Sequence, residues 1–350
     1  MRLIIGVVLL VAGCGGSNEV EHLTAAPDEL TALTYNMYYG LAADLVPEDL
    51  STGSLSATMT SVINATSLTD FGCRIDVTAS QIVAEDPDVI GLQEALLIAF
   101  ARELDDPSDD RNLVDFIDTL NDAIVRAGGP RYQVFQRRNA TLQDSLPLFG
   151  GVRIADRGAI LVHPRLAAKE VGSMTFEVLE PSSDIGGNGG VVVRGALHVQ
   201  VPFPTGTIDL FTTHLQSGGD PAVRDAQAQE LASWIAGTSA PDGTIVLMGD
   251  LNDVATSPAV TALTATLVDT YATVGTPPGF TAYQTQTLSD PVDQADMRID
   301  YVLVHAGQVE DSRVIFNAQA GPCNLWPSDH FGVVSRFKTA ATPPPARPSE

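Results

Sequence analysis

Six short polar signatures constrain this chain most, because each lies at one end of an apolar, strand-like run. In chain order they are Thr34-Tyr35-Asn36-Met37, Gln93-Glu94, Thr213-His214-Leu215-Gln216, Gly249-Asp250-Leu251-Asn252-Asp253, Arg298-Ile299-Asp300-Tyr301 and Ser328-Asp329-His330. Together they hold carboxylates, carboxamides and two histidines. These are the groups that a metal-assisted attack of water on a phosphate ester requires.

The length and the net charge of the chain limit the size of its core and the partners that it can attract. The chain has 350 residues, of which 44% are apolar, and this is ample for a sizeable core. Its formal net charge of -24 at pH 7 disfavours long-range attraction to nucleic acid or to anionic lipid. A locally positive, metal-loaded cleft can still capture one phosphate.

The first residues predict export. Met1-Arg2 precede an apolar run over residues 3–10, which is too short to span a bilayer and is typical of a secretory signal. The run ends at Val11-Ala12-Gly13-Cys14, which resembles the lipobox of bacterial lipoproteins. We expect a lipidated Cys14 to anchor the protein to a membrane, facing the periplasm or the cell exterior. The alternative is a plain cleaved signal with an incidental cysteine, and hence a secreted protein.

The rest of the chain divides simply. We expect a lipoprotein signal peptide over 1–13, a tether over 14–29, one folded domain over 30–339 and a Pro-rich disordered tail over 340–350. A repeat of solenoid period and a long internal linker are both missing from the sequence, and we expect a monomer without an evident protein partner. If Cys14 carries lipid, Cys73 and Cys323 remain, either as a disulfide or as two buried thiols.

Strand-like runs outnumber helix-like segments. The predicted strands are 33–38, 88–92, 132–136, 159–162, 191–201, 207–213, 244–248, 299–304, 313–316 and 331–337. Helical spacing predicts helices over 78–85, 112–127, 222–236 and 257–263. Hairpin-like neighbours such as 191–201 and 207–213 favour antiparallel pairing, and two sheets packed face to face with helices outside fit the pattern. A doubly wound parallel sheet is the alternative, but the strand and glycine-rich turn of nucleotide folds are missing.

Four of the polar residues suggest a cation site and a phosphate site. Asp250 and Asn252 follow the apolar run 244–248, and side chains two apart at a strand end can face one cleft, although Gly-Asp-x-Asn also occurs in ordinary turns. Asn36 and Glu94 offer oxygen ligands that suit Mg²⁺, Mn²⁺ or Ca²⁺ rather than zinc. The alternative for Glu94 is a first-turn charge on a helix that we expect to follow it.

The histidines suggest proton transfer. A histidine acting as a general base works best when a carboxylate fixes its tautomer, so His330 calls for a partner such as Asp300. Asp300 heads a buried-looking strand, where an unpaired charge is costly. The alternative for Asp300 is a surface salt bridge with Arg298. His214 is a second histidine at a strand end, and its alternative is a core histidine with a satisfied hydrogen bond.

In these residues the chain resembles the endonuclease/exonuclease/phosphatase superfamily of metal-dependent phosphodiesterases. That superfamily includes pancreatic-type DNases, apurinic endonucleases, inositol-phosphate 5-phosphatases and neutral sphingomyelinases. The matching motifs cover about residues 33–337 in the family's order. The resemblance implies an α/β fold, a four-layer α/β sandwich of two mainly antiparallel sheets, with the site at one rim of the sheets.

The resemblance also implies roles for single residues. Glu94, with Asn36 beside it, would hold the main Mg²⁺; Asp250 and Asn252 would position phosphate and nucleophile or share a second metal, and Asp329 would support the metal or the neighbouring histidine. His330 would take the proton of the attacking water, and Asp300 would orient it. His214 would stabilise the pentacovalent phosphate or protonate the leaving oxygen.

The substrate is less constrained. The stretch Arg194-Gly195-Ala196-Leu197, leading to His214-Leu215-Gln216, looks most like secreted bacterial sphingomyelinases. Arg194 would then reach phosphate, with a solvated charge as the alternative. A Trp-bearing apolar hairpin for membrane insertion is not evident, and the polar stretch 41–74 has no assigned role.

We therefore expect an exported Mg²⁺-dependent phosphoesterase, with sphingomyelinase-like lipid phosphodiesters slightly favoured over nucleic acid. An extracytoplasmic nuclease is the alternative, favoured by a cluster of arginines at 137, 138, 153 and 157. A surface-binding lipoprotein without activity is a further alternative, although every main signature has the expected residue type.

Overall fold

The computed structural model describes residues 28–38, 55–103, 108, 110–146, 150–179, 184–185, 190–191, 193–240, 242–319 and 323–339. The expected signal peptide, Cys14, most of the tether and the tail lie outside these residues. Within them, none of the helices is both long and apolar enough to cross a membrane.

The larger sheet has eight strands in the order β15-β16-β1-β2-β6-β3-β4, with β5 paired to β6. Its strands are β1 (Glu29–Asn36), β2 (Val89–Gln93), β3 (Leu97–Ala101), β4 (Arg111–Asp115), β5 (Gln133–Leu146), β6 (Gly150–Val162), β15 (Gly307–Ile315) and β16 (Gly332–Thr339). β1 and β2 are parallel, and the other pairs are antiparallel. The ends of β1 and β2 therefore reach the same rim.

The second sheet has six strands in the order β13-β14-β12-β11-β10-β7. They are β7 (Lys169–Thr175), β10 (Gly195–Phe203), β11 (Gly206–His214), β12 (Thr244–Asp250), β13 (Val268–Asp269) and β14 (Asp300–His305). Here too one pair, β11 with β12, is parallel and the others are antiparallel. A short pair, β8 (Asp184–Ile185) with β9 (Gly190–Val191), stands apart.

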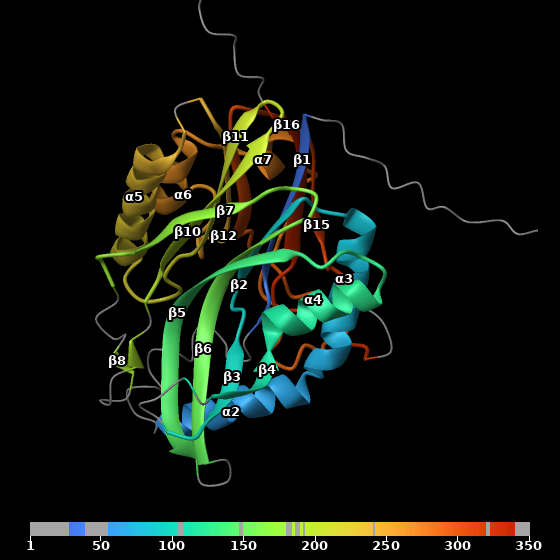
Figure 1. Ribbon diagram of the computed structural model, residues 1–350, viewed down its shortest axis with the longest axis vertical. Helices are drawn as coiled ribbons and strands as arrows, with labels where there is room; N and C mark the ends of the chain where they lie inside the picture. Colours follow the sequence, from blue (N-terminus) through green and yellow to red (C-terminus); the bar gives the residue numbers. More distant parts are fainter. Residues whose placement is uncertain are drawn as a thin grey trace, which may run out of the picture.

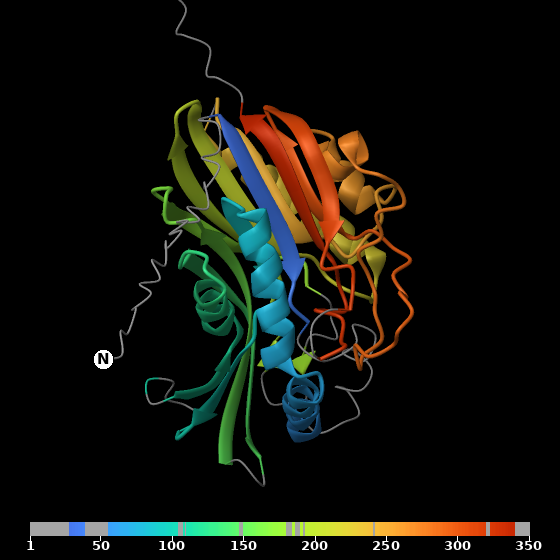
Figure 2. The same cartoon turned by 90° about the vertical axis from the view of Figure 1, so that its right-hand side faces the viewer.

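Helices cover the outer faces of both sheets (Figures 1 and 2). The helices are α2 (Leu55–Leu68), α3 (Phe71–Glu85), α4 (Phe116–Arg126), α5 (Pro221–Thr238), α6 (Pro258–Thr264) and α7 (Thr270–Val274). One apolar core joins α2, α3 and α4 to the larger sheet, a second lies between the sheets, and a third joins α5 and α6 to the smaller sheet. The predicted sandwich of two mainly antiparallel sheets with helices outside is confirmed.

Strand alternation explains why one rim of the inner layer is polar. On β1, Leu30 and Ala32 lie in the core between the sheets, and the same face continues through Thr34 to Asn36. The inward faces of β11 and β12 are likewise apolar along the strand and end in His214 and Asp250. On β14, which runs antiparallel to β12, the polar residue of the inward face is the first one, Asp300. Each strand is thus apolar within the sandwich and polar at the rim.

Gly91 lets the sheets approach each other just below that rim. It is part of the inward face of β2, and a Cβ atom at this position would lie 2.6 Å from Cβ of Met248 on β12. A contact that short requires one of the sheets to shift. The absence of a side chain at Gly91 therefore brings the rim residues of the two sheets within reach of one another.

Several local expectations were wrong. A strand, β3, follows Glu94 where a helix was expected, and residues 111–115 form β4 rather than the first turn of α4. β3 pairs with β6 and β4 pairs with β3, so pairing within the sheet, rather than the local sequence pattern, decides their conformation. The polar stretch 41–74 contains α2, which was not predicted; residues 41–54 of this stretch lie outside the described chain.

A disulfide joins Cys73 on α3 to Cys323, with the two Cα atoms 6.0 Å apart, so the paired alternative is confirmed. Cys323 lies in the segment that leads to Ser328-Asp329-His330. The next residue along α3, Arg74, is buried and donates from Nη1 to the carbonyl oxygen of Pro327 at 2.5 Å. The covalent bond and this hydrogen bond together tie the last signature to the outer helix layer.

We expect loss of this disulfide to lower the free energy of unfolding by about 2–4 kcal/mol, because it closes a loop with a sequence separation of 250. Urea unfolding with and without reductant measures the change. The Cys73→Ser/Cys323→Ser variant is the control, and its lower stability should not respond to reductant. Equal stability of the oxidised and reduced wild type would contradict the prediction.

Candidate active site

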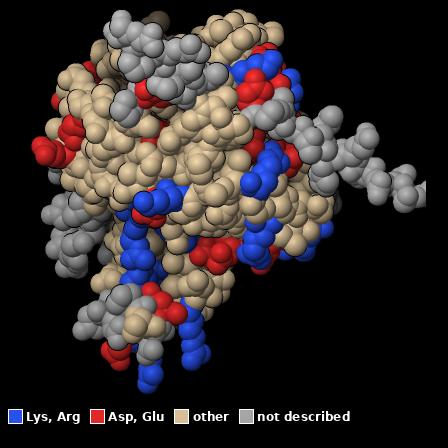
Figure 3. Space-filling model, turned by 45° about the horizontal axis from the view of Figure 1, so that its top comes forward, with Lys and Arg blue, Asp and Glu red and all other residues tan. Residues whose placement is uncertain are grey.

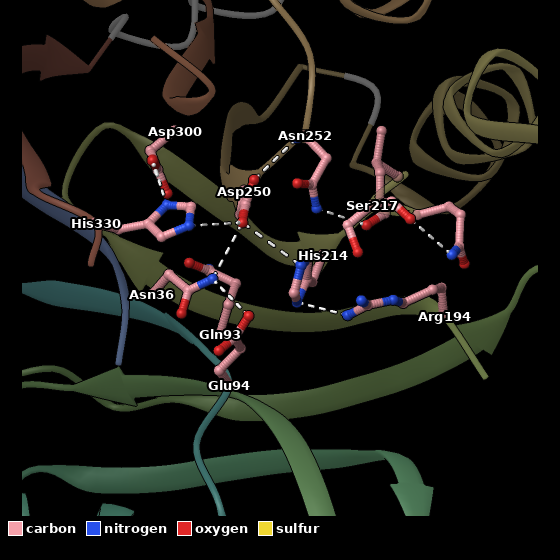
Figure 4. A network of polar contacts seen from close by, with 12 residues as sticks. Asn36, Gln93, Glu94, Arg194, His214, Ser217, Asp250, Asn252, Asp300 and His330 are labelled. Carbon is pink, nitrogen blue, oxygen red and sulfur yellow. Dashed lines mark hydrogen bonds and ion pairs between the residues drawn. The ribbon is translucent and has the colours of Figure 1, made fainter. Parts of the chain in front are cut away.

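The predicted site residues converge at one rim of the sandwich (Figure 4). They come from strands of both sheets: Asn36 at the end of β1, Glu94 after β2, His214 at the end of β11, Asp250 at the end of β12, Asp300 at the start of β14 and His330 just before β16. All of them are at least nine-tenths buried. The parallel pairs β1–β2 and β11–β12, and the pairing of Asp250 with Asp300 across antiparallel strands, place them side by side.

The Asp250 carboxylate lies at the centre of this group. Its Oδ2 accepts a hydrogen bond from Asn36 Nδ2 at 3.1 Å, and the Nε2 atoms of His214 and His330 lie 3.4 and 3.8 Å from the same oxygen. Its Oδ1 accepts from the backbone N–H of Asn252 at 2.9 Å. Asp250 therefore connects both histidines to the amide of Asn36.

Asn36 bridges two acidic groups. Its Nδ2 donates to Glu94 Oε1 at 3.1 Å as well as to Asp250, while its Oδ1 accepts from the backbone N–H of Tyr38 at 3.1 Å. Asn36 thus holds the two carboxylates beside each other with its amide nitrogen. Its carbonyl oxygen, which was expected to ligate a metal, is already hydrogen-bonded here.

Asp300 and His330 form the predicted pair. His330 Nδ1 and Asp300 Oδ2 are 2.9 Å apart, and the backbone N–H groups of Ile299 and Asp300 both donate to Thr281 Oγ1. The alternative partner of Asp300 is ruled out, because Arg298 forms a two-pronged ion pair with Asp269 instead. The imidazole of His330 consequently directs Nε2 toward Asp250.

Burial and neighbouring charge shift the pKa values of this pair. Burial raises the pKa of Asp300 to about 6 despite the attraction of His330. Burial alone would lower the pKa of His330, but the carboxylates of Asp300, Asp250 and Asp329 outweigh it and raise that pKa well above its ordinary value. His330 is thus a strongly basic imidazole in a buried acidic setting.

His214 has the opposite environment. Its Nδ1 lies 2.6 Å from Nη1 of Arg194, which is buried beside it on the adjoining strand. Burial, followed by the charges of Arg194 and His330, lowers the pKa of His214 well below its ordinary value. The alternative of a solvated Arg194 is therefore wrong, and the guanidinium contacts a histidine directly.

Asn252 and Asp329 are the two remaining predicted residues of the site. Asn252 has a left-handed backbone, with φ of 52°, and its Nδ2 donates to the carbonyl oxygen of Leu215 at 3.0 Å. Asp329 accepts from Ser328 Oγ at 3.3 Å, and burial raises its pKa to about 6. Glu94 also has a left-handed backbone, with φ of 53°. Such backbone conformations in residues other than glycine are concentrated at functional sites.

Tyr283 was missed by sequence reasoning. Its hydroxyl donates to Asn252 Oδ1 at 3.2 Å, and its ring lies edge-on to the His330 imidazole, with centroids 5.0 Å apart. It follows a segment whose Ala282 forms isolated bridges with both Met297 and His330. The sequence around it lacks a strand-end pattern, so its only signal was an aromatic residue ahead of Arg298-Ile299-Asp300.

Two overlapping sets of residues have the chemistry to hold a cation. Glu94 and Asp250 are neighbouring buried carboxylates joined by Asn36, and like charges this close favour a cation between them. Atoms of Asp250, Asp300 and His330 also lie within 4.8 Å of one another. The second set contains the hydrogen-bonded pair of His330 with Asp300, so binding a metal there would compete with proton transfer. We favour Glu94 and Asp250.

The four arginines near β5 and β6 do not form an open basic surface. Arg137, Arg153 and Arg157 are buried, and Arg138 is exposed. Arg153 pairs with Asp110, and Arg157 forms a two-pronged pair with Asp115. The feature that favoured a nuclease is therefore largely internal to the fold.

Solved structures share this architecture. An endonuclease/exonuclease/phosphatase family protein from Bacteroides thetaiotaomicron is 18% identical, with 89% of this chain and 98% of that chain covered and a TM-score of 0.57. A mannosyl-6-phosphatase from Bacteroides thetaiotaomicron VPI-5482 is 19% identical, with coverage of 88% and 99% and a TM-score of 0.56. Truncated TDP2 from Caenorhabditis elegans is 17% identical, with coverage of 89% and 98% and a TM-score of 0.52. These likenesses show the fold.

A comparison with curated proteins found no match. The model of the Endonuclease/Exonuclease/phosphatase family, whose members are metal-dependent hydrolases of phosphoester bonds, matches residues 33–330. The matched span contains every strand-end signature, including the Asp300–His330 pair and the bridged carboxylates Glu94 and Asp250. The chain therefore belongs to the endonuclease/exonuclease/phosphatase family.

Proposed function

We propose that this protein is an exported, Mg²⁺-dependent phosphodiesterase that directs water onto a phosphodiester. The observation that carries the proposal is one buried rim where the Asp300–His330 pair faces the carboxylates Asp250 and Glu94. A general base and a cation site thus adjoin each other, as hydrolysis of a phosphate ester requires. A binding module without activity has no need of such buried charge.

Glu94 and Asp250 would hold the cation, with Asn36 fixing the distance between them and Asp329 nearby. All of the expected ligands offer oxygen, which suits Mg²⁺ and also permits Mn²⁺ or Ca²⁺. When bound, the ion would offset negative charge on the phosphate oxygens and lower the pKa of water.

The side chains divide the remaining work. In its neutral form, His330 donates its Nδ1 proton to Asp300, which leaves the Nε2 lone pair free to take a proton from the attacking water. Asn252 has one Nδ2 proton committed to Leu215 and a second available for a phosphate oxygen. His214 lies across Asp250 from His330 and completes the phosphate-facing group.

For the substrate, we propose a lipid phosphodiester first and nucleic acid second. The net charge of -24 and the buried ion pairs of Arg153 and Arg157 give little support to a polyanion-binding surface. On the face drawn in Figure 3, Lys and Arg occur in small groups, several of them beside Asp or Glu, within a surface that is mostly neither. The mannosyl-6-phosphatase among the solved structures also makes a sugar phosphate a test substrate.

The cellular setting is proposed from the sequence. Residues 1–13 would direct export, and a lipidated Cys14 would hold a monomer at a membrane, facing the periplasm or the cell exterior. The disulfide between Cys73 and Cys323 supports an oxidising compartment.

The function is tested by hydrolysis of sphingomyelin vesicles, plasmid DNA, a sugar phosphate and an aryl phosphodiester, each with Mg²⁺ or with chelator. We expect chelator-sensitive release of phosphocholine, and we expect His330→Ala to lower kcat by roughly 10²–10⁴-fold because the general base is lost. The control is His305→Ala, at the exposed far end of β14. Cleavage of DNA alone would favour the nuclease, and normal turnover by His330→Ala would remove His330 from the mechanism.

A cation held by Glu94 should stabilise the folded protein. We expect Mg²⁺ at about 100-fold above its dissociation constant to raise the free energy of unfolding by about 2.7 kcal/mol, because the ion binds only the folded state. Glu94→Gln should abolish this gain, whereas Glu170→Gln on the exposed strand β7 should retain it. Urea unfolding with Mg²⁺, Mn²⁺, Ca²⁺ or chelator measures the effect. An unchanged Mg²⁺ response in Glu94→Gln would place the ion elsewhere.

Tyr283→Phe should lower kcat on the order of tenfold with little change in KM, because it frees the Asn252 amide while the ring stays against His330. The matched control is Tyr271→Phe, whose hydroxyl donates to the Thr276 carbonyl oxygen away from the site. Steady-state kinetics on the best substrate compare the two variants. Equal rates for Tyr283→Phe and wild type would remove the hydroxyl from catalysis.

A further inference from the structure

The two site histidines have different partners at Nδ1, and this fixes the location of their protons. His330 Nδ1 faces a carboxylate, Asp300 Oδ2, which only accepts hydrogen bonds when ionised. His214 Nδ1 faces the guanidinium of Arg194 at 2.6 Å, and a guanidinium only donates. Nδ1 must therefore carry the proton in His330 and the lone pair in His214. Because an imidazole keeps at least one ring proton, Nε2 of His214 is an N–H group.

Both Nε2 atoms face the same oxygen, Asp250 Oδ2, at 3.4 Å from His214 and 3.8 Å from His330 (Figure 4). The His214 nitrogen presents an N–H group to this oxygen. A positively charged His214 would place an Nδ1–H group against the N–H groups of Arg194 at 2.6 Å, which this geometry does not allow. His214 is consequently a neutral hydrogen-bond donor toward the centre of the site.

The fold holds Arg194 in this position. Its carbonyl oxygen accepts from the backbone N–H of Phe176, and its Nη1 lies 4.0 Å from Asp156 Oδ2. The next residue, Gly195, pairs with His214 across the β10–β11 ladder, so the two side chains leave neighbouring strand ends. Arg194 is only 4% exposed. Reaching out to bind phosphate would break its contact with His214 and move its charge away from Asp156.

Asp156 is held in turn by a hydrogen bond from a residue of β5. Asn139 Nδ2 donates to its Oδ2 at 3.3 Å, and Arg137 donates to Asn139 Oδ1 and to Thr175 Oγ1. Gly195 leaves room for this second guanidinium, because a Cβ at that position would lie 2.5 Å from Arg137 Nη2. A buried network thus runs from the middle of the β5–β6 hairpin to His214.

We propose that Arg194 is a positioning residue that holds His214 in its Nε2-protonated neutral form, so that His214 donates a hydrogen bond to a phosphoryl oxygen and does not protonate the leaving group. The role rests on the phosphoester hydrolysis proposed above. In that reaction the water oxygen bonds to phosphorus and gives one proton to His330 Nε2. The bond from phosphorus to the leaving oxygen breaks, its electron pair stays on that oxygen, and solvent water supplies the proton.

The resting tautomer is tested without any substrate. The full-length protein is labelled with ¹⁵N-histidine, and His214→Gln identifies the signals of His214 with Mg²⁺ and with chelator. We expect an unprotonated Nδ1 and a protonated Nε2 in the wild type, and a loss of this preference in Arg194→Met. A protonated Nδ1 in the wild type would overturn the proposal. The wild-type spectrum decides this even if Arg194→Met does not fold.

The role in turnover is tested with aryl phosphodiesters whose leaving groups differ in pKa. We expect His214→Ala to lower kcat by roughly 10²–10³-fold, as for loss of an oxyanion donor, and by the same factor for every leaving group. A loss that grows with leaving-group pKa would make His214 a general acid and overturn the proposal. If no phosphoester is hydrolysed at all, the proposed function fails, while the tautomer is still decided by the spectra.

Variants of Arg194 separate positioning from phosphate binding. Arg194→Gln keeps an N–H donor and should restore most of the kcat that Arg194→Met loses. The double variant Arg194→Met/His214→Ala should be no slower than His214→Ala, because Arg194 acts only through His214 and has no further effect once that side chain is removed. Arg138→Met, on the exposed face of β5, is the control for loss of positive charge. A raised KM in Arg194→Met, with losses that multiply in the double variant, would show direct phosphate binding instead.

Discussion

The site depends on one buried carboxylate. Asp250 accepts from the Asn36 amide and the Asn252 backbone, and both histidines direct Nε2 toward its Oδ2. A carboxylate that is only 1% exposed is stable only if hydrogen-bonding partners surround it. The partners of Asp250 come from strand ends of both sheets, so its burial requires these ends to lie close together. Removal of any one partner would leave charge uncompensated in the sandwich.

The sandwich in turn makes this arrangement possible by bringing its sheets close together. Gly91 leaves space for Met248 just below the rim, and Gln93 Nε2 donates to Thr212 Oγ1 across the gap. Apolar packing deeper in the strands therefore gives way to polar contact over one or two residues. The apolar core between the sheets excludes charged side chains, whereas at the rim charged side chains are buried together with hydrogen-bonding partners.

The two imidazoles show how one residue type can perform two tasks. Asp300 supports a basic His330, while Arg194 keeps His214 neutral with its proton on the inner nitrogen. Burial and then the Arg194 charge lower the pKa of His214, whereas Asp300 and the neighbouring carboxylates outweigh burial and raise the pKa of His330. A neighbouring carboxylate and a neighbouring guanidinium are thus sufficient to separate an acceptor from a donor within the same small site.

The sequence by itself determined the layers and most of the site, because both follow from local patterns. Apolar alternation ending in Asn36, Asp250 or His214 identifies inward-facing strand ends, and an even pair of cysteines suggested the disulfide. Only the tertiary structure decided β3 and β4, whose conformation comes from the pairing of β3 with β6 and of β4 with β3. It alone also placed Tyr283 beside Asn252 and Arg194 beside His214. In each pair the two residues belong to different segments of the chain, so no local sequence pattern predicts the contact.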